Sequence, residues 1–101
     1  MITCRVDYVI DPYKLDEFEQ YAKLWMPLVQ EMGGTHHGYF LPAEGANNEA
    51  MCLFSFPSLA AYEDYRVRSQ THAGCQQAFA YAQQTRCVLS VRRTFLKPLM
   101  P

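Results

Sequence analysis

The sequence lacks most of the short motifs that identify a known activity. It contains no C-x-x-C pair, no phosphate-binding glycine loop, no dinucleotide-binding glycine pattern, no nucleophile elbow and no zinc-binding helix motif. These absences argue against nucleoside triphosphate, nicotinamide and hydrolase chemistry, and we expect no cofactor. They do not exclude small enzymes whose families carry no short fingerprint.

An excess of charge of one sign is also missing. Nine basic and ten acidic residues give a net charge of −1, so the basic surface of a nucleic-acid binder is not expected. No apolar run is long enough to span a bilayer, and residues 1–5 lead directly into a strand pattern instead of a signal peptide. We therefore expect a cytoplasmic protein without a membrane or nucleic-acid partner.

The four cysteines are far apart in the sequence: Cys4, Cys52, Cys75 and Cys87. In a protein without a secretion signal, such cysteines are expected to be reduced thiols.

The 101 residues are enough for one domain, which we place over residues 1–101. Half of the residues are apolar and 14% are aromatic, so the chain can form a core. An aromatic content this high favours a dense core, an oligomer interface or an aromatic pocket.

The first third of the chain predicts a strand followed by a helix. Apolar residues alternate over 2–10, which is the pattern of a half-buried strand. Asp11-Pro12 predicts a helix N-cap with proline at the first helical position, and apolar residues then recur every three or four positions up to Met32. Pro27 predicts a kink or an early end, and Gly33-Gly34 predicts the helix stop.

The remainder predicts three more strands and a second helical region. Strands are expected over 35–41, 50–56 and 87–96. Ser58 is expected to cap a helix that breaks at 71–74, before a further helical stretch over 75–84 that carries Phe79 and Ala82 inward. The order is β-α-β-β-α-β, which predicts a ferredoxin-like α+β sandwich with strand order 4-1-3-2 and its helices on one face.

In this fold the face of the sheet without helices needs cover. A strand surface rich in Tyr, Phe and Val would be an unusually large exposed apolar patch, and the C-terminal tail 95–101 is also apolar. A second copy of the chain is the simplest cover, so we expect a homodimer in which two sheets form a dimeric α/β barrel.

An ordered set of segments carries a family resemblance. The segments are Asp11-Pro12 with Leu15 and Phe18, Gly33-Gly34 with Gly38-Tyr39, the loop 44–47, and residues 56–62 at the start of the second helix. On these segments nearly the whole chain resembles the NIPSNAP family of the dimeric α/β-barrel superfamily. The resemblance implies the fold, a dimer and a range of chemistries: cofactor-free monooxygenases, haem-degrading enzymes, and isomerase-like or decarboxylase-like proteins.

Two adjacent histidines, His36 and His37, are candidate catalytic residues. Neighbouring residues of a regular strand point to opposite faces, so the pair is not expected to hold a metal unless a bulge forms beside Gly38. A histidine that titrates near neutral pH can act as a general acid or base. The alternative is a histidine that is hydrogen-bonded for purely structural reasons.

The start of the second helix supplies further candidates. Tyr62 and Tyr65 are expected to bind a ligand, and Arg66 is a catalytic candidate that would hold a carboxylate or an enolate. In the alternative interpretation one tyrosine packs in the core, and Arg66 pairs with Glu63 at the surface. Ligand-binding roles are also assigned to three aromatic residues, Trp25, Tyr39 and Phe54, although Trp25 and Phe54 equally suit a core.

These candidates lead to one function hypothesis and one alternative. We expect a pocket between helices and sheet that binds a small apolar or carbonyl-containing molecule, with cofactor-free monooxygenase-type or isomerase-type chemistry as an extension. In that chemistry His36 or His37 removes a proton, and Arg66 or a tyrosine stabilises the resulting anion. The alternative is a non-catalytic structural or interaction homodimer.

The membership of the pocket depends on which histidine faces the helices. If His37 does so, it is expected to share the pocket with Tyr39, Tyr65 and Arg66, since His37 and Tyr39 lie two residues apart. If His37 faces the other way, His36 takes the inward position.

Overall fold

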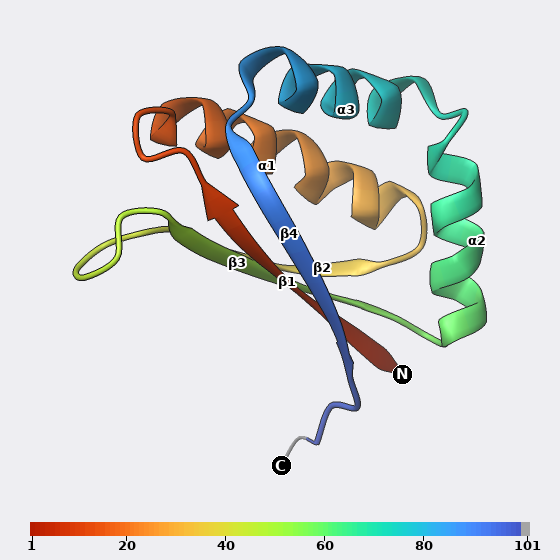
Figure 1. The fold of residues 1–101 in the computed structure, drawn as a ribbon. Helices are drawn as coiled ribbons and strands as arrows, with labels where there is room; N and C mark the ends of the chain where they lie inside the picture. The colour runs from red at the N-terminus through yellow and green to blue at the C-terminus, as the bar shows by residue number, and fades with distance from the viewer. Residues whose placement is uncertain (100–101) are drawn as a thin grey trace.

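The computed structural model describes residues 1–99 and contains four strands and three helices. In chain order the elements are β1 (Ile2–Ile10), α1 (Leu15–Glu31), β2 (Thr35–Phe40), β3 (Glu49–Phe56), α2 (Leu59–Ser69), α3 (Ala73–Thr85) and β4 (Val88–Leu96). The strands form one antiparallel sheet in the order β2-β3-β1-β4 (Figure 1). The predicted ferredoxin-like α+β fold and its strand order are confirmed.

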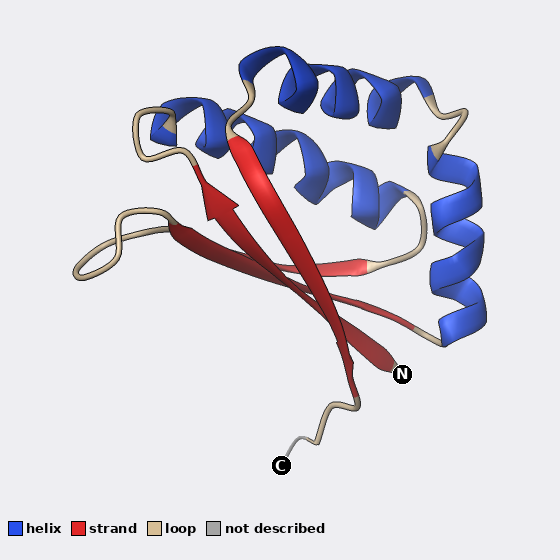
Figure 2. Ribbon diagram, viewed as in Figure 1, coloured by secondary structure: helices blue, strands red, loops and turns tan. Residues whose placement is uncertain are grey.

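The three helices lie on one side of the sheet (Figure 2). Helix α1 lies over the sheet, α3 packs beside it, and α2 stands at the end of the sheet where β3 finishes. Alternate residues of β1 are buried beneath the helices, as the sequence pattern predicts. Among the described residues, no helix has the length and apolar content needed to cross a membrane.

Two details of α1 differ from the sequence prediction. The helix begins at Leu15 instead of Pro12, because the Asp11 carboxylate accepts the Tyr13 N–H at 2.9 Å and forms a turn that delays the helix. The helix then continues through Pro27 to Glu31, so the early end is not observed. The predicted stop is confirmed, with Gly33 at a φ of +96° that favours glycine.

The second helical region is divided as predicted. The Ser58 hydroxyl accepts the Ala61 N–H at 3.1 Å at the start of α2. His72 caps α3, since its Nδ1 accepts the Gly74 N–H at 3.1 Å. The buried residues of α3 are Cys75 and Ala78. Of the two residues expected to point inward, Ala82 is half-buried, and Phe79 is 41% exposed although its ring lies 5.1 Å from that of Trp25.

A β-bulge in β2 decides which histidine faces the helices. His36 pairs with Phe54 and Gly38 pairs with Leu53, so His37 is the extra residue between them. Gly38 accommodates the bulge at a φ of +107°, a conformation that other residues rarely adopt. Because the bulge shifts the alternation by one residue, His36 and Tyr39 share the helix-covered face. The prediction that His37 shares a face with Tyr39 is wrong.

The helix-free face is less aromatic than the sequence pattern predicts. The inward alternation places Tyr8, Phe54 and Phe56 under the helices, where they are buried. The helix-free face instead exposes a few apolar side chains, those of Val9, Phe40 and Leu96, beside polar residues. The last two residues of the apolar tail, 100 and 101, lie outside the described residues.

Candidate functional site

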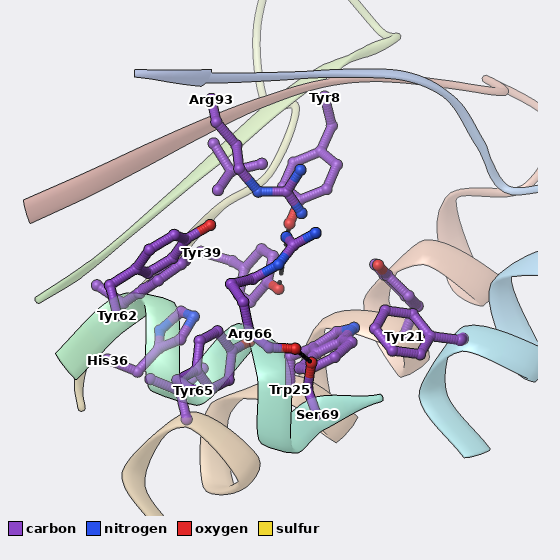
Figure 3. Close-up of a pocket in the computed structure, with 14 residues that line it drawn as sticks. Tyr8, Tyr21, Trp25, His36, Tyr39, Tyr62, Tyr65, Arg66, Ser69 and Arg93 are labelled. Carbon is purple, nitrogen blue, oxygen red and sulfur yellow. Dashed lines mark hydrogen bonds between the residues drawn. The ribbon is translucent and has the colours of Figure 1, made fainter. Parts of the chain in front are cut away.

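A cavity of about 50 Å³ lies between the helix-covered face of the sheet and the helices (Figure 3). Fourteen residues from β1, α1, β2, β3, α2, α3 and β4 line it. They are Val6, Tyr8, Tyr21, Trp25, Val29, His36, Tyr39, Phe54, Tyr62, Tyr65, Arg66, Ser69, Phe79 and Arg93. A cavity of this size has room for several water molecules or for part of a small planar ligand.

All but one of the residues that the sequence nominated lie around this cavity. Seven line it: Trp25, His36, Tyr39, Phe54, Tyr62, Tyr65 and Arg66. His37 does not, because the bulge directs it to the helix-free face. There its Nε2 lies 2.7 Å from the Ser55 hydroxyl oxygen, which lies 2.7 Å from that of Thr3. The nomination of His37 as a pocket residue is therefore wrong.

Sequence reasoning missed several residues of the pocket wall, among them Tyr8, Tyr21 and Arg93. Tyr8 lies on the inward face of the first predicted strand, so alternation alone could have nominated it. Arg93 pairs with Val6 in the register of β1 and β4, which places it on the helix-covered face. An isolated arginine on an edge strand carries no sequence signal that distinguishes it from a solvated one.

His36 is held as a neutral hydrogen-bond donor. Its ring stacks on Tyr39 with centroids 5.0 Å apart and on Phe54 at 5.8 Å. Its Nδ1 accepts the backbone N–H of Gly38 at 2.9 Å, so the proton of the neutral ring is on Nε2. Burial, with a smaller effect from the neighbouring His37, lowers the pKa of His36 to about 4.

This arrangement contradicts the hypothesis that a pocket histidine removes a proton. A general base needs a free lone pair, and the one available on His36 is occupied by a backbone N–H. His36 can instead donate from Nε2 to an oxygen atom of a ligand.

Trp25 offers a second donor that lacks an acceptor. Its side chain is 7% exposed, and among the described residues its Nε1 is the one buried side-chain nitrogen or oxygen without a hydrogen-bond partner. The nearby Tyr21 hydroxyl does not meet hydrogen-bonding geometry. Burial raises the pKa of Tyr21, and the indole N–H partly opposes this rise. A buried N–H without an acceptor is costly, and a ligand oxygen would remove that cost.

The tyrosines beside β1 and β2 form the polar part of the cavity floor. The Tyr8 and Tyr39 hydroxyl oxygens are 3.5 Å apart, and Tyr8 Oη is 3.8 Å from Cys52 Sγ. Burial raises the pKa of both tyrosines well above the usual value, and it raises that of the Cys52 thiol to about 11. These groups stay protonated at neutral pH and do not act as bases.

Two arginines complete the cavity, Arg66 from α2 and Arg93 from β4. Figure 3 shows their guanidinium groups pointing toward one another. Within residues 1–99 neither guanidinium has an ion pair or a side-chain hydrogen bond, so the expected surface pair of Arg66 with Glu63 does not form. No lining residue is acidic. In the described part of the chain, no group of three or more His, Cys, Asp or Glu residues is arranged to hold a metal ion.

Comparison with solved structures gives the same fold over nearly the whole chain. Protein Atu4242 from Agrobacterium tumefaciens superposes with a TM-score of 0.84 at 16% identity, covering 98% of this chain and 94% of that one. A NIPSNAP family protein from the same organism, Atu5224, gives 0.81 at 17% identity, with coverages of 97% and 92%. A putative antibiotic biosynthesis monooxygenase from Nitrosomonas europaea gives 0.76 at 9% identity, with coverages of 99% and 100%.

No curated protein matches the chain. The family model for NIPSNAP matches residues 5–100, which is almost the complete sequence. This chain therefore belongs to the NIPSNAP family.

Proposed function

We propose that the pocket binds a small planar molecule that contains a carbonyl group. The observation that carries the proposal is Trp25, whose side chain lines the cavity and whose buried N–H has no acceptor among the described residues. A carbonyl oxygen is the simplest group that would accept from it and from the Nε2–H of His36. Both donors come from regular secondary structure, α1 and β2, and both residues line the same cavity.

The walls of the cavity support a planar ligand. Eight of the lining residues are phenylalanine, tyrosine or tryptophan with rings that contact one another, and apolar pockets with few polar groups are the usual form of small-molecule sites. Tyr62 bridges the two sides of the site, since its ring lies 6.3 Å from Phe54 and 4.9 Å from Phe95 of β4. An aromatic or conjugated ligand would stack on these rings.

Binding is tested by a thermal-shift screen of planar carbonyl compounds that includes both neutral members, such as acetophenone and benzamide, and anionic ones, such as benzoate. Mass spectrometry of the purified protein would identify any molecule that is retained from the cell. We expect stabilisation of the native chain and a smaller shift for Trp25→Phe, which keeps an aromatic ring but removes the N–H. If no compound stabilises the protein, the proposed function is wrong.

Cofactor-free chemistry is the catalytic extension of this proposal. Donors that bind a carbonyl oxygen also stabilise its enolate, the species from which such isomerase-type and monooxygenase-type reactions begin. Because His36 is not a suitable base, the substrate must carry a proton acidic enough to pass to solvent water, as a 1,3-dicarbonyl compound does, which leaves the enolate in the pocket. Deuterium exchange from D₂O into such a compound should be faster with the native protein than with His36→Asn; equal rates would leave binding without catalysis.

The second candidate is an assembly without catalysis. We propose that the helix-free face pairs with a second copy of the chain, which is supported by the exposed side chains of Val9, Phe40 and Leu96 on that face. Light scattering at micromolar concentration should give about twice the chain mass of 11.7 kDa; a monomer would contradict the dimeric barrel.

The four buried free thiols support our further proposal that the protein resides in the reducing cytoplasm.

A further inference from the structure

We propose that the pocket selects the anionic form of its ligand, a carboxylate or an enolate, and that Arg66 and Arg93 together recognise the negative charge. This inference rests on the proposed function and adds the charge of the ligand to it. Arg93 is the new element, because it brings a second cation to the pocket from the opposite side.

The geometry brings two positive groups to one place without a counter-charge. Arg93 is directed to the helix-covered face by its pairing with Val6, and Arg66 approaches from α2. The two guanidinium groups act on the same buried residues: both oppose the rise that burial causes in the pKa of the Cys4 thiol. Both side chains are exposed, so solvent screens part of the repulsion between them, and an anion bound between them would relieve the remainder.

Acidic side chains of the chain do not supply this anion. Asp64 lies on the same helix as Arg66, but its carboxylate is paired with Arg68 at 2.8 Å. Asp7 faces the helix-free side of the sheet, where it is paired with Arg5 at 3.1 Å. Since no Asp or Glu among residues 1–99 lines the cavity, a bound ligand is the source of negative charge that we propose.

The neutral donors fit an anion better than they fit a neutral carbonyl. The indole N–H of Trp25 and the Nε2–H of His36 each provide one hydrogen bond, and a carboxylate or enolate oxygen accepts such bonds more strongly than a neutral oxygen does. Guanidinium groups add paired donors with the geometry that a carboxylate requires. These four donors thus favour the same form of the ligand.

The chain contains a single tryptophan, Trp25, so its fluorescence reports directly on the cavity. The experiment titrates benzoate and its neutral isostere benzamide into the native protein and into the variants Arg66→Gln and Arg93→Gln. Arg92→Gln is the matched control, because Arg92 is next to Arg93 on β4 but lies opposite Asp7 in the strand register and so faces the helix-free side.

We expect benzoate to bind the native protein at least about tenfold more tightly than benzamide, as charge-assisted hydrogen bonds would give. Arg66→Gln and Arg93→Gln should each weaken benzoate by about five- to tenfold and leave benzamide unchanged, whereas Arg92→Gln should leave both within about twofold. Added salt should weaken benzoate only.

Two results would overturn the inference in distinguishable ways. Equal affinities for benzoate and benzamide, or an Arg93→Gln variant that binds benzoate like the control, would remove charge selection and leave carbonyl binding in place. If neither compound changes Trp25 fluorescence or thermal stability, the proposed function falls together with this inference. Circular dichroism of each variant separates these results from a loss of folding.

Discussion

The two faces of the sheet differ in whether their polar side chains have partners within the chain. On the helix-free face the polar side chains bind one another: Arg5 pairs with Asp7, and His37, Ser55 and Thr3 lie in one hydrogen-bonded row. On the helix-covered face the cavity brings together the Trp25 N–H and two arginines, none of which has an acceptor among residues 1–99.

This difference distinguishes a structural surface from a binding site. Buried polar groups are normally satisfied within the protein, so the Trp25 N–H without an acceptor needs a separate explanation. Arg66 and Arg93 are exposed to solvent, and their distinguishing feature is that two cations line one cavity without an acidic lining residue. The adjacent residues His36 and His37 show the contrast within one strand. His37 is exposed and bonded to Ser55, whereas His36 presents its remaining N–H toward an aromatic cavity.

The largest expected effect is on stability, which should depend far more on the helix-covered face than on the helix-free face. Phe18 is a fully buried residue of α1, with its ring 5.1 Å from that of Tyr8 on β1, so Phe18→Ala should lower the free energy of unfolding by about 3–5 kcal/mol. Phe40, which is 57% exposed on the helix-free face, should cost less than about 1 kcal/mol when changed to alanine. Urea unfolding of both variants checks this, and equal losses would contradict the assignment of the core.

A smaller effect is expected from the bulge that sends the two histidines to opposite faces. Gly38→Ala meets no atom within 4 Å, so its cost comes from the φ of +107° and should be about 1–3 kcal/mol. Gly45→Ala is the matched control, because Gly45 has a φ of +96° in a loop away from the pocket. Both variants should lose stability, but only Gly38→Ala should change Trp25 fluorescence. An unchanged fluorescence spectrum for Gly38→Ala would contradict the link between the bulge and the arrangement of the cavity.

The lowered pKa of His36 predicts a pH dependence of the free energy of unfolding. Its pKa is about 4 in the folded chain against an ordinary value of 6.5, so between these values the unfolded chain binds the extra proton. Stability should therefore fall as the pH drops from 6.5 to 4. Since the ring is partly accessible to solvent, we expect the loss to be about 1–2 kcal/mol.

The same pH series with His36→Asn provides the control, because the asparagine side-chain oxygen can still accept the Gly38 N–H. The difference between the native protein and the variant isolates His36 from the other two histidines. Parallel pH curves for the two proteins would show that His36 is not held neutral.

The smallest effect is expected on the helix-free face. The ion pair of Arg5 and Asp7 is accessible to solvent, so Arg5→Ala should change the free energy of unfolding by less than about 0.5 kcal/mol. A larger loss in urea unfolding, which depends on protein concentration, would instead indicate that this pair lies in an interface between two copies.

The sequence predicted the fold well because the fold depends on periodic patterns. The alternation in β1, the Ser58 cap and the glycine stop after α1 each appear where local chemistry requires them. The start of α1 was wrong because Asp11 forms a turn with Tyr13 instead of a helix cap.

The candidate site was only partly predictable. The aromatic wall followed from strand and helix periodicity, but the exchange of His37 for His36 depended on a one-residue bulge. Such a bulge is compatible with glycine at position 38 but is not required by it. Arg93 was missed since its direction follows from the register between β1 and β4, which forms between residues distant in sequence.

The most direct test of the unsatisfied donors is the indole N–H resonance of Trp25 in a ¹H–¹⁵N spectrum of the labelled protein. The chain has one tryptophan, so this resonance is unambiguous. Titration with benzoate should shift it downfield along a saturating curve, because the N–H gains an acceptor. An indole resonance that does not move at millimolar benzoate, while the protein remains folded, would contradict the account.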